Sequence, residues 1–489
     1  MDLLKAISDL ETVWKSNDLF VFKGLRWSRE EFEAILQSDV FRALFPEKEI
    51  DRKFRGILKP FIFERGEKTV FCRYTRDHND NNIMTEISAL TTEMIEVDKL
   101  FFYERTVEKN ALDLIYKPYT YELSFDEKLP ERFYHDYEEN AWYEVVVRKY
   151  EEKEPGKVYG RLCYGASPLD YQTVEIEWTR KITTAVPLGQ FEIAQDDIDN
   201  YYNAQNPDLI TGWLDWLFDN NQSRVLLVCR VGQANAVLGV NKLASPGEKR
   251  HFAFDVGLPN DNNIKWLGSS VDRKVSGLYD EGILESSNPN VVFISHWHTD
   301  HFKGAFIMSR DVYIGKNRAM WIAPYYKVNG KSYNANRLVA YLIETGQIAF
   351  VGDVYSYSKN NIALFRVKSS DPSDLNNDCI LLQLNSTLLP GDCFYDNWPT
   401  NYGMHNTIKN LIISHHASKS SCSVNTESKL KTVFNNGTNK AYVCVGMNDW
   451  GHPDGGVINM FSDAGRLGFD VISTLDCNRQ KMDFVIHDL

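Results

Sequence analysis

Three histidines and one aspartate lie close together directly after a short hydrophobic run. Residues 291–294 are typical of a buried strand. Four possible metal ligands follow within six positions: His296, His298, Asp300 and His301. Imidazole nitrogens and carboxylate oxygens are ligands that zinc and related cations prefer. Because alternate residues of an extended loop point the same way, we expect His296 and His298 to share one metal, while Asp300 and His301 hold a second.

Other predicted strands in the same half of the chain also run into polar loops. The segments are 378–389 before Asp392, 409–413 before His415 and His416, and 441–445 before Asn448 and His452. Six of the 11 histidines lie in the loops after these strands and after residues 291–294, which a packing role for histidine does not explain. A rigid sheet could present all these loops along one edge. Asp392 is well suited to bridge two metals, since a carboxylate can give one oxygen to each.

Length and cysteine content indicate a multidomain protein of a reducing compartment. With 489 residues the chain is too long for one ordinary hydrophobic core, so at least two domains are expected. The eight cysteines are scattered and include no Cys-x-x-Cys pair, which favours free thiols and a cytoplasmic location. Residues 1–18 predict an amphipathic helix rather than a signal peptide, and no run approaches the ~18 apolar residues of a membrane span.

The two parts of the chain differ in charge and in pattern. Residues 1–220 contain 28 Lys and Arg against 43 Asp and Glu, whereas residues 221–489 contain 26 against 24. We predict an acidic α+β accessory domain over residues 1–205, a linker helix over 206–222 and an α/β domain over 223–489. The acidic surface disfavours nonspecific duplex binding and could face a basic protein partner.

The region between the two domains is expected between about residues 196 and 223. Residues 196–206 are polar and are interpreted as a linker. Residues 207–221 predict a helix that packs between the domains through one apolar face, made of Leu209, Trp213, Trp216 and Leu217. Two more helices are expected at about residues 425–434 and 457–467. His78 and His135 in the accessory domain have no plausible ligand neighbours and are interpreted as structural.

The series of motifs resembles one superfamily of metalloenzymes. The His-x-His-x-Asp-His run at residues 296–301 is similar to the signature of the metallo-β-lactamase superfamily. More narrowly, the chain resembles the hydrolase domain of ComEC-type DNA-uptake proteins through VGQANA (231–236), FDVG (254–257), NNDCILLQL (376–384), LLPGD (388–392), HHASKSS (415–421) and MNDWGHP (447–453). The resemblance covers residues 222–489 and none of the preceding chain.

Some positions depart from the family pattern. ComEC-type sequences often have Asp where this chain has His298, their HHGS has become HHAS, and their VGQGD has become VGQAN. No histidine lies between His301 and Asp392, where many superfamily members have a metal ligand. The resemblance therefore implies a first metal with one protein ligand fewer, either bound more weakly or completed by a substrate oxygen. The membrane channel that accompanies this domain in ComEC proteins has no counterpart in these residues.

The resemblance implies a fold and a cofactor. The fold would be an αβ/βα sandwich, with two mixed sheets back to back, flanking helices and the metals at one edge. Two divalent cations, zinc or manganese, would lower the pKa of a bound water and stabilise charge on the attacked and leaving oxygens. His416 is the expected further ligand, with His415 hydrogen-bonded behind it.

The resemblance also implies roles for residues around the metals. Asp300 would orient the attacking water, and Asp392 would bridge the cations. Ser418 and Lys419 would contact a phosphate. Asn448 and His452 would contact the leaving group, with His452 taking part in catalysis.

These observations predict a metal-dependent hydrolase that uses a metal-bound hydroxide, as a phosphodiesterase or nuclease acting on nucleic acid or a nucleotide. Two other hypotheses stay open. One is hydrolysis of a different ester, such as a lactone, thioester or phosphorylcholine ester. The other is a non-catalytic assembly or sensing module with a degenerate metal site. A basic groove would favour the nuclease, a narrow closed pocket the small ester, and a plugged site the third hypothesis.

Overall fold

The computed structural model describes residues 19–22, 25–28, 67–77, 84–91, 95, 121–125, 138, 141–150, 152–164, 171–182, 193–218, 224–229, 234–241, 250–257, 290–306, 319–328, 333–369, 374–399, 408–434, 439–445, 451–474 and 484–488. The chain divides into two compact units: Met1–Thr75 with Thr85–Glu192, and Arg76–Met84 with Ile193–Leu489. The helix predicted over residues 1–18, both histidines interpreted as structural, and Asn448 lie outside the described residues. None of the described helices is long and apolar enough to cross a membrane.

The first unit contains a closed barrel of strands in the order β3-β4-β5-β7-β8-β6. Their bounds are β3 Glu67–Asp77, β4 Met84–Thr91, β5 Tyr121–Phe125, β6 Trp142–Arg148, β7 Val158–Tyr164 and β8 Tyr171–Lys181. A short hairpin, β1 (Leu19–Phe22) with β2 (Leu25–Ser28), precedes them. Alternate residues such as Val145 and Val147 are buried, as expected of strands with one face toward a core. These strands supply the β part of the region that was predicted to be α+β.

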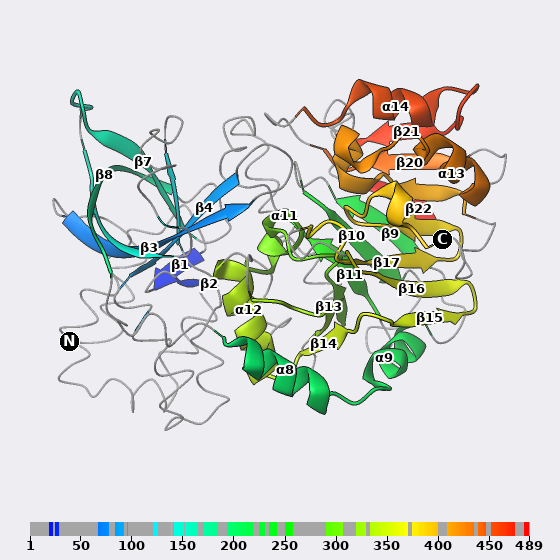
Figure 1. Ribbon diagram of the computed structural model, residues 1–489, viewed down its shortest axis with the longest axis horizontal. Coiled ribbons are helices and arrows are strands. Elements are labelled where there is room, and N and C mark those ends of the chain that lie inside the picture. The colour runs from blue at the N-terminus through cyan, green and yellow to red at the C-terminus, as the bar shows by residue number, and fades with distance from the viewer. Residues whose placement is uncertain are drawn as a thin grey trace. The chain divides into compact units, whose positions relative to one another are not determined.

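The second unit contains two seven-stranded mixed sheets (Figure 1). The first has the order β14-β13-β12-β11-β10-β9-β22, with β9 Arg224–Cys229, β10 Ala236–Asn241, β11 Phe252–Val256, β12 Val291–Phe293, β13 Met320–Pro324, β14 Ile348–Val351 and β22 Phe484–Asp488. The second runs in order from β15 to β21, with β15 Ser356–Lys359, β16 Ile362–Val367, β17 Cys379–Leu384, β18 Thr387–Leu389, β19 Asn410–Ile412, β20 Lys440–Val443 and β21 Asp470–Ser473. In the first sheet the pairs from β11 to β14 are parallel, and those joining β11, β10, β9 and β22 are antiparallel. In the second sheet the pairs from β15 to β18 are antiparallel, and those from β18 to β21 are parallel.

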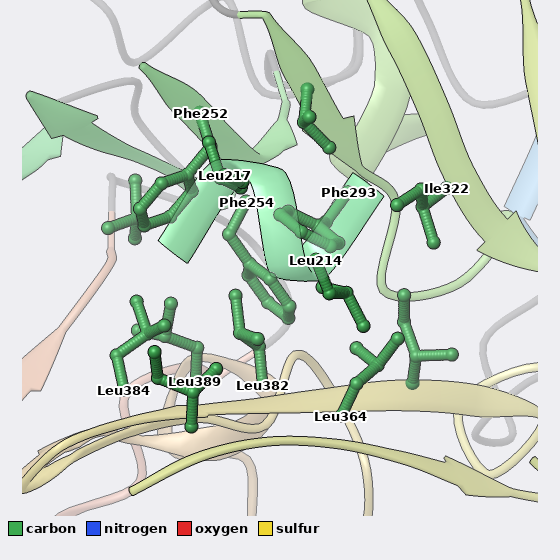
Figure 2. Packing of buried hydrophobic residues seen from close by; sticks show 14 of the residues in the cluster. Leu214, Leu217, Phe252, Phe254, Phe293, Ile322, Leu364, Leu382, Leu384 and Leu389 are labelled. Atoms are coloured by element: carbon green, nitrogen blue, oxygen red, sulfur yellow. The ribbon is translucent and has the colours of Figure 1, made fainter. Parts of the chain in front are cut away.

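A hydrophobic core fills the space between the two sheets. Figure 2 shows Phe254 and Phe293 of the first sheet facing Leu364 and Leu382 of the second. The residues that a strand contributes to this core recur at every second position, for example Ile380, Leu382 and Leu384 of β17, because strand side chains alternate between the two faces of the sheet. The mixed α/β class expected for this region is therefore confirmed.

Helices complete the layers of the second unit. α13 (Thr426–Val433) and α14 (Gly455–Ser462) form a second apolar cluster with residues of the second sheet that face away from the first. Leu430 and Phe461 are among their contributions. Both helices were expected from the sequence and are confirmed. α12 (Tyr333–Glu344) leads through a short turn into β14, and all ten residues from 333 to 342 are buried.

Residues 196–206 were interpreted from the sequence as a linker, but most of them belong to helix α8 (Gln195–Ala204). The helix and the residue after it bond to the edge strand β14. The Gln205 amide donates to the Phe350 carbonyl (3.1 Å) and accepts from the Phe350 amide (2.8 Å). Tyr201 donates to the carbonyl of Ile348 (2.8 Å). The segment is polar because it satisfies the open edge of a sheet, and not because it spans solvent. The domain boundaries themselves stay a prediction.

Helix α9 (Leu209–Phe218) packs in the core of the second unit. Its buried residues are Ile210, Leu214 and Leu217, whereas Trp216 is 37% exposed and lies under the guanidinium of Arg250. Figure 2 shows Leu214 and Leu217 in the same core as Phe252, Phe254 and Phe293. The predicted inner face was therefore wrong at Trp216, whereas Leu217 is buried, and Leu209 and Trp213 pack partly buried against the same core. The register is set by the space between the sheets, which branched aliphatic side chains fill better than an indole.

Gln205→Ala is expected to lower the free energy of unfolding by about 1–3 kcal/mol, because the amide and carbonyl of buried Phe350 lose their partners. Asn203→Ala, an exposed position in the same helix, serves as the control and should change it by less than about 0.5 kcal/mol. Urea denaturation measures both. Equal stability of the two variants would contradict the edge-covering role of α8.

Candidate metal centre

The polar loops of the second unit follow parallel strands of both sheets. In the first sheet β11 ends beside Asp255, and β12 leads into the histidine cluster. In the second sheet β18 leads to Asp392, and β19 leads to His415 and His416. Because the carboxyl ends of parallel strands meet at one edge, the loops of each sheet gather there. The two sheets pack face to face, so their loops meet as well.

The loop after β12 turns two histidines toward each other. Nε2 of His296 lies 2.9 Å from Nδ1 of His298. Trp297 between them points into the protein, where its indole donates to the Pro324 carbonyl (3.1 Å). The chain then forms a four-residue helical turn, α11 (Thr299–Phe302), followed by a 3-10 turn, η4 (Lys303–Phe306). Residues 307–318 lie outside the described part of the chain.

The structure brings all six predicted metal ligands together, and Asp392 is the residue that they share. One group contains Asp300, His301, Asp392 and His416, and the other contains His296, His298 and Asp392. In each group the potential ligand atoms lie within 4.8 Å of one another. Asp392 belongs to both groups and is 2% exposed. This is the arrangement expected of a carboxylate between two cations, and the assignment to metals stays a prediction.

The two oxygens of Asp392 face different histidines. Oδ1 lies 3.3 Å from Nε2 of His301 and 4.0 Å from Nε2 of His416. Oδ2 lies 3.9 Å from Nε2 of His296 and 3.8 Å from Nε2 of His415. His415 was expected to lie behind His416. That expectation was wrong, because Nε2 of His415 faces Oδ2 of Asp392, whereas Nε2 of His416 faces Oδ1.

An unusual backbone turn produces this arrangement. β19 is followed by the 3-10 turn η7 (Ser414–Ala417), in which three consecutive residues have positive φ: His415 (50°), His416 (52°) and Ala417 (62°). The left-handed conformation costs about 1–2 kcal/mol for each residue other than glycine. Adjacent side chains of an extended strand would point to opposite faces, whereas this turn brings both rings to one carboxylate.

The buried nitrogens of two histidines fit a metal ligand. Nδ1 of His416 donates to the Cys444 carbonyl (2.6 Å), so the lone pair of this ring is on Nε2. The Nε2 atoms of His416 and His301 are buried and have no hydrogen-bond partner among the described residues. A buried imidazole nitrogen that lies beside carboxylates and makes no hydrogen bond is typical of a metal ligand. The residues present therefore fit a divalent metal.

The electrostatics point the same way. Burial lowers the pKa of His296 well below its usual value, and the charges of His301 and His298 add to this effect, so the ring is a neutral donor. Burial also disfavours a charged His301, but its pKa is raised well above the usual range by surrounding carboxylates, those of Asp392, Asp255 and Asp300. Burial opposes ionisation of Asp392, yet nearby imidazoles hold its pKa well below the usual value. A divalent cation would supply the positive charge that protonated imidazoles otherwise provide.

From the sequence, Asp255 was part of the FDVG motif and had no assigned role, and the structure places it directly behind His301. Its Oδ2 accepts from Nδ1 of His301 (2.8 Å), and its carboxylate also accepts from the amide (2.6 Å) and hydroxyl (2.8 Å) of Ser295. A carboxylate that holds the Nδ1 proton directs the Nε2 lone pair of the ring toward Asp392. Asn235 is a second residue that sequence reasoning missed, since its amide donates to Asp392 Oδ1 (3.3 Å).

Asp255→Asn is expected to weaken metal binding at the position that contains His301 about 10–100-fold. The side-chain NH2 group of asparagine cannot accept the hydrogen bond from Nδ1 of His301, so the ring loses its orientation. Metal titration by calorimetry measures this. Asp208→Asn, an exposed carboxylate of the same unit, is the control. Wild-type affinity in Asp255→Asn would show that the carboxylate does not position His301.

The predicted substrate-binding residues lie in different environments. The Ser418 side chain is buried, and its hydroxyl pairs with that of Ser420 (2.8 Å), capping the turn η8 (Lys419–Ser421). Ser418 therefore stabilises the loop, and its contact with a phosphate stays a prediction. Lys419 is exposed. The His452 ring lies 5.5 Å from that of His415, at the rim of the cluster.

Comparisons with known proteins give little information about this chain. No protein-family model matches it, and no curated protein matches it. One similar solved structure is a mutant of the CmlA beta-hydroxylase, which is 10% identical, with 88% of this chain and 78% of that chain covered and a TM-score of 0.25. A similarity of this size does not establish a shared fold. These comparisons establish no family.

Proposed function

We propose that the second unit is a metal-dependent hydrolase of the metallo-β-lactamase type that acts on phosphodiester bonds. The observation that supports this most directly is the position of Asp392, whose two oxygens face separate sets of imidazoles. Two facing mixed sheets with their polar loops at one edge, together with the order of the sequence motifs, support the choice of family.

The side chains of the site differ in their exposure to solvent, and we assign their roles from this difference. Bound divalent cations would activate water and stabilise charge on the attacked and leaving oxygens. The side chains of His301, Asp392 and His416 are at most 2% exposed, so they hold position, whereas that of Asp300 is 23% exposed. Asp300 is therefore the carboxylate that a water or substrate would meet, and it would orient the water and accept its proton.

A phosphodiester is the substrate class that suits this arrangement. Two cations held by one bridging carboxylate can clamp the attacking and leaving oxygens of an in-line displacement. Exposed Lys419, three residues after His416, would contact a phosphate, and His452, whose ring lies 5.5 Å from that of His415, would contact the leaving group. Nucleic acid or a nucleotide would then be the substrate.

The test is a rate measurement on the full chain, freed of metal with a chelator and reloaded with zinc or manganese. The panel contains bis(p-nitrophenyl) phosphate, single-stranded DNA, a cyclic dinucleotide, a lactone, a thioester and a phosphorylcholine ester. Metal-dependent cleavage within the first three supports the proposal. Cleavage confined to the other esters would replace the substrate class, and bound metal with no hydrolysis would favour an assembly or sensing role.

A further inference from the structure

We propose that His415 is the remaining protein ligand of the metal position formed by His296, His298 and Asp392. The inference rests on the proposed metal centre and adds a residue to it. The sequence contains no histidine between His301 and Asp392 that could complete this position. The structure supplies one from the opposite sheet, in the turn after β19.

The distances to Asp392 divide the histidines into two pairs. Nε2 of His415 lies 3.8 Å from Oδ2, the same oxygen that Nε2 of His296 approaches to 3.9 Å. Two atoms that bind one metal, each at about 2.0–2.2 Å, lie roughly 3.3–4.4 Å apart, depending on the angle between them. Both spans fall in that range. The oxygen Oδ1 has its own pair, His301 and His416.

The surroundings of His415 hold its ring at this place. The ring stacks on Phe394, with 6.0 Å between the centroids and 16° between the planes. Nδ1 lies 3.5 Å from the hydroxyl of Ser420, on the side of the ring away from Asp392. An imidazole that directs one nitrogen to a hydroxyl and the other to a carboxylate oxygen is oriented as a metal ligand usually is.

The strained turn supports a functional reason for this placement. Three successive left-handed residues are costly, and such strain persists where the surrounding structure requires it, most often at functional sites. If only His416 were a ligand, one ring would need to reach the site. With His415 included, each cation has three side chains of its own group together with Asp392 shared between them, because the adjacent histidines separate to opposite oxygens.

The experiment compares metal binding by the wild-type chain, His415→Ala, His416→Ala and the control Asp208→Asn, which changes an exposed carboxylate of the same unit. Calorimetric titration of the metal-free proteins with zinc is followed by elemental analysis of the dialysed proteins. Wild type and the control should bind two zinc ions. We expect His415→Ala to weaken one binding event by about 100-fold, since loss of even an outer-shell partner of a ligand costs about 10–100-fold. His416→Ala should weaken the other event.

Two further measurements keep the result interpretable. His415→Asn removes the imidazole while retaining a residue that tolerates positive φ, and melting curves show whether each variant folds. With cobalt in place of zinc, the visible absorption of the position formed by His296, His298 and Asp392 should change in both His415 variants and stay unchanged in Asp208→Asn.

Each outcome decides the matter. Two zinc ions bound with wild-type affinity by folded His415→Ala and His415→Asn would overturn the role of His415 while leaving the metal centre in place. A wild type that binds one zinc ion, lost in His416→Ala but retained in His415→Ala, would overturn it as well. No metal uptake by the wild type would overturn the proposed function together with this inference.

Discussion

Asp392→Asn is expected to abolish hydrolysis, with a loss of about 10²-fold or more in kcat, as is usual when an electrostatic group of the transition state is removed. Asp392 is buried, and its two oxygens face His301 and His296 at 3.3 and 3.9 Å. Asparagine keeps the shape but offers one neutral oxygen in place of two that share a charge. Mutual repulsion of two cations would no longer be offset, so at least one metal should be lost.

The measurement combines a rate with a phosphodiester that the wild type cleaves, the metal content and a melting curve. The variant should stay folded, because Asn235 already donates to Oδ1 at this position and the amide occupies nearly the same volume. Asp463→Asn, in the turn after α14, is a control at a carboxylate away from the site. Full activity of Asp392→Asn would contradict the two-metal arrangement.

Gly257→Ala is expected to destabilise the second unit by about 3 kcal/mol or more and to disrupt the site with it. A Cβ atom at this position would lie 1.8 Å from the Asp300 carbonyl oxygen and 2.7 Å from that of Asn235. Both obstacles are backbone atoms, so no change of side-chain rotamer relieves the contact. The amide of Gly257 also donates to the Asn235 carbonyl (2.7 Å), which ties the end of β11 to the loop before β10.

The control for this substitution is Gly212→Ala in helix α9, where an added Cβ meets nothing within 4 Å. Alanine is the better helix former, so this variant should be more stable by about 0.5–1 kcal/mol. Chemical denaturation and metal titration of both variants measure the effect. Wild-type stability and metal affinity in Gly257→Ala would show that the contact between Gly257 and the backbone of Asp300 does not hold the site.

The sequence by itself determined the local elements and the chemistry that they carry. Hydrophobic runs predicted strands such as β12, β17 and β19, and apolar spacing predicted α13 and α14. These predictions depend on residues close together in the chain, where side-chain periodicity alone decides the structure. The histidines and aspartates after the strands indicated metal chemistry because few other functions require such residues at that spacing.

Only the tertiary structure decided which residues meet. Asp255 and His301 are 46 positions apart, and nothing in the chain between them predicts that one orients the other. In the sequence the polar residues of α8 resemble a linker. In the structure Tyr201 and Gln205 bond to the edge strand β14, which is distant in the chain. The face of α9 depends on the space between two sheets. The separation of His415 and His416 to opposite oxygens of Asp392 depends on a left-handed turn that alternation along a strand cannot predict, because it is held by contacts from distant loops.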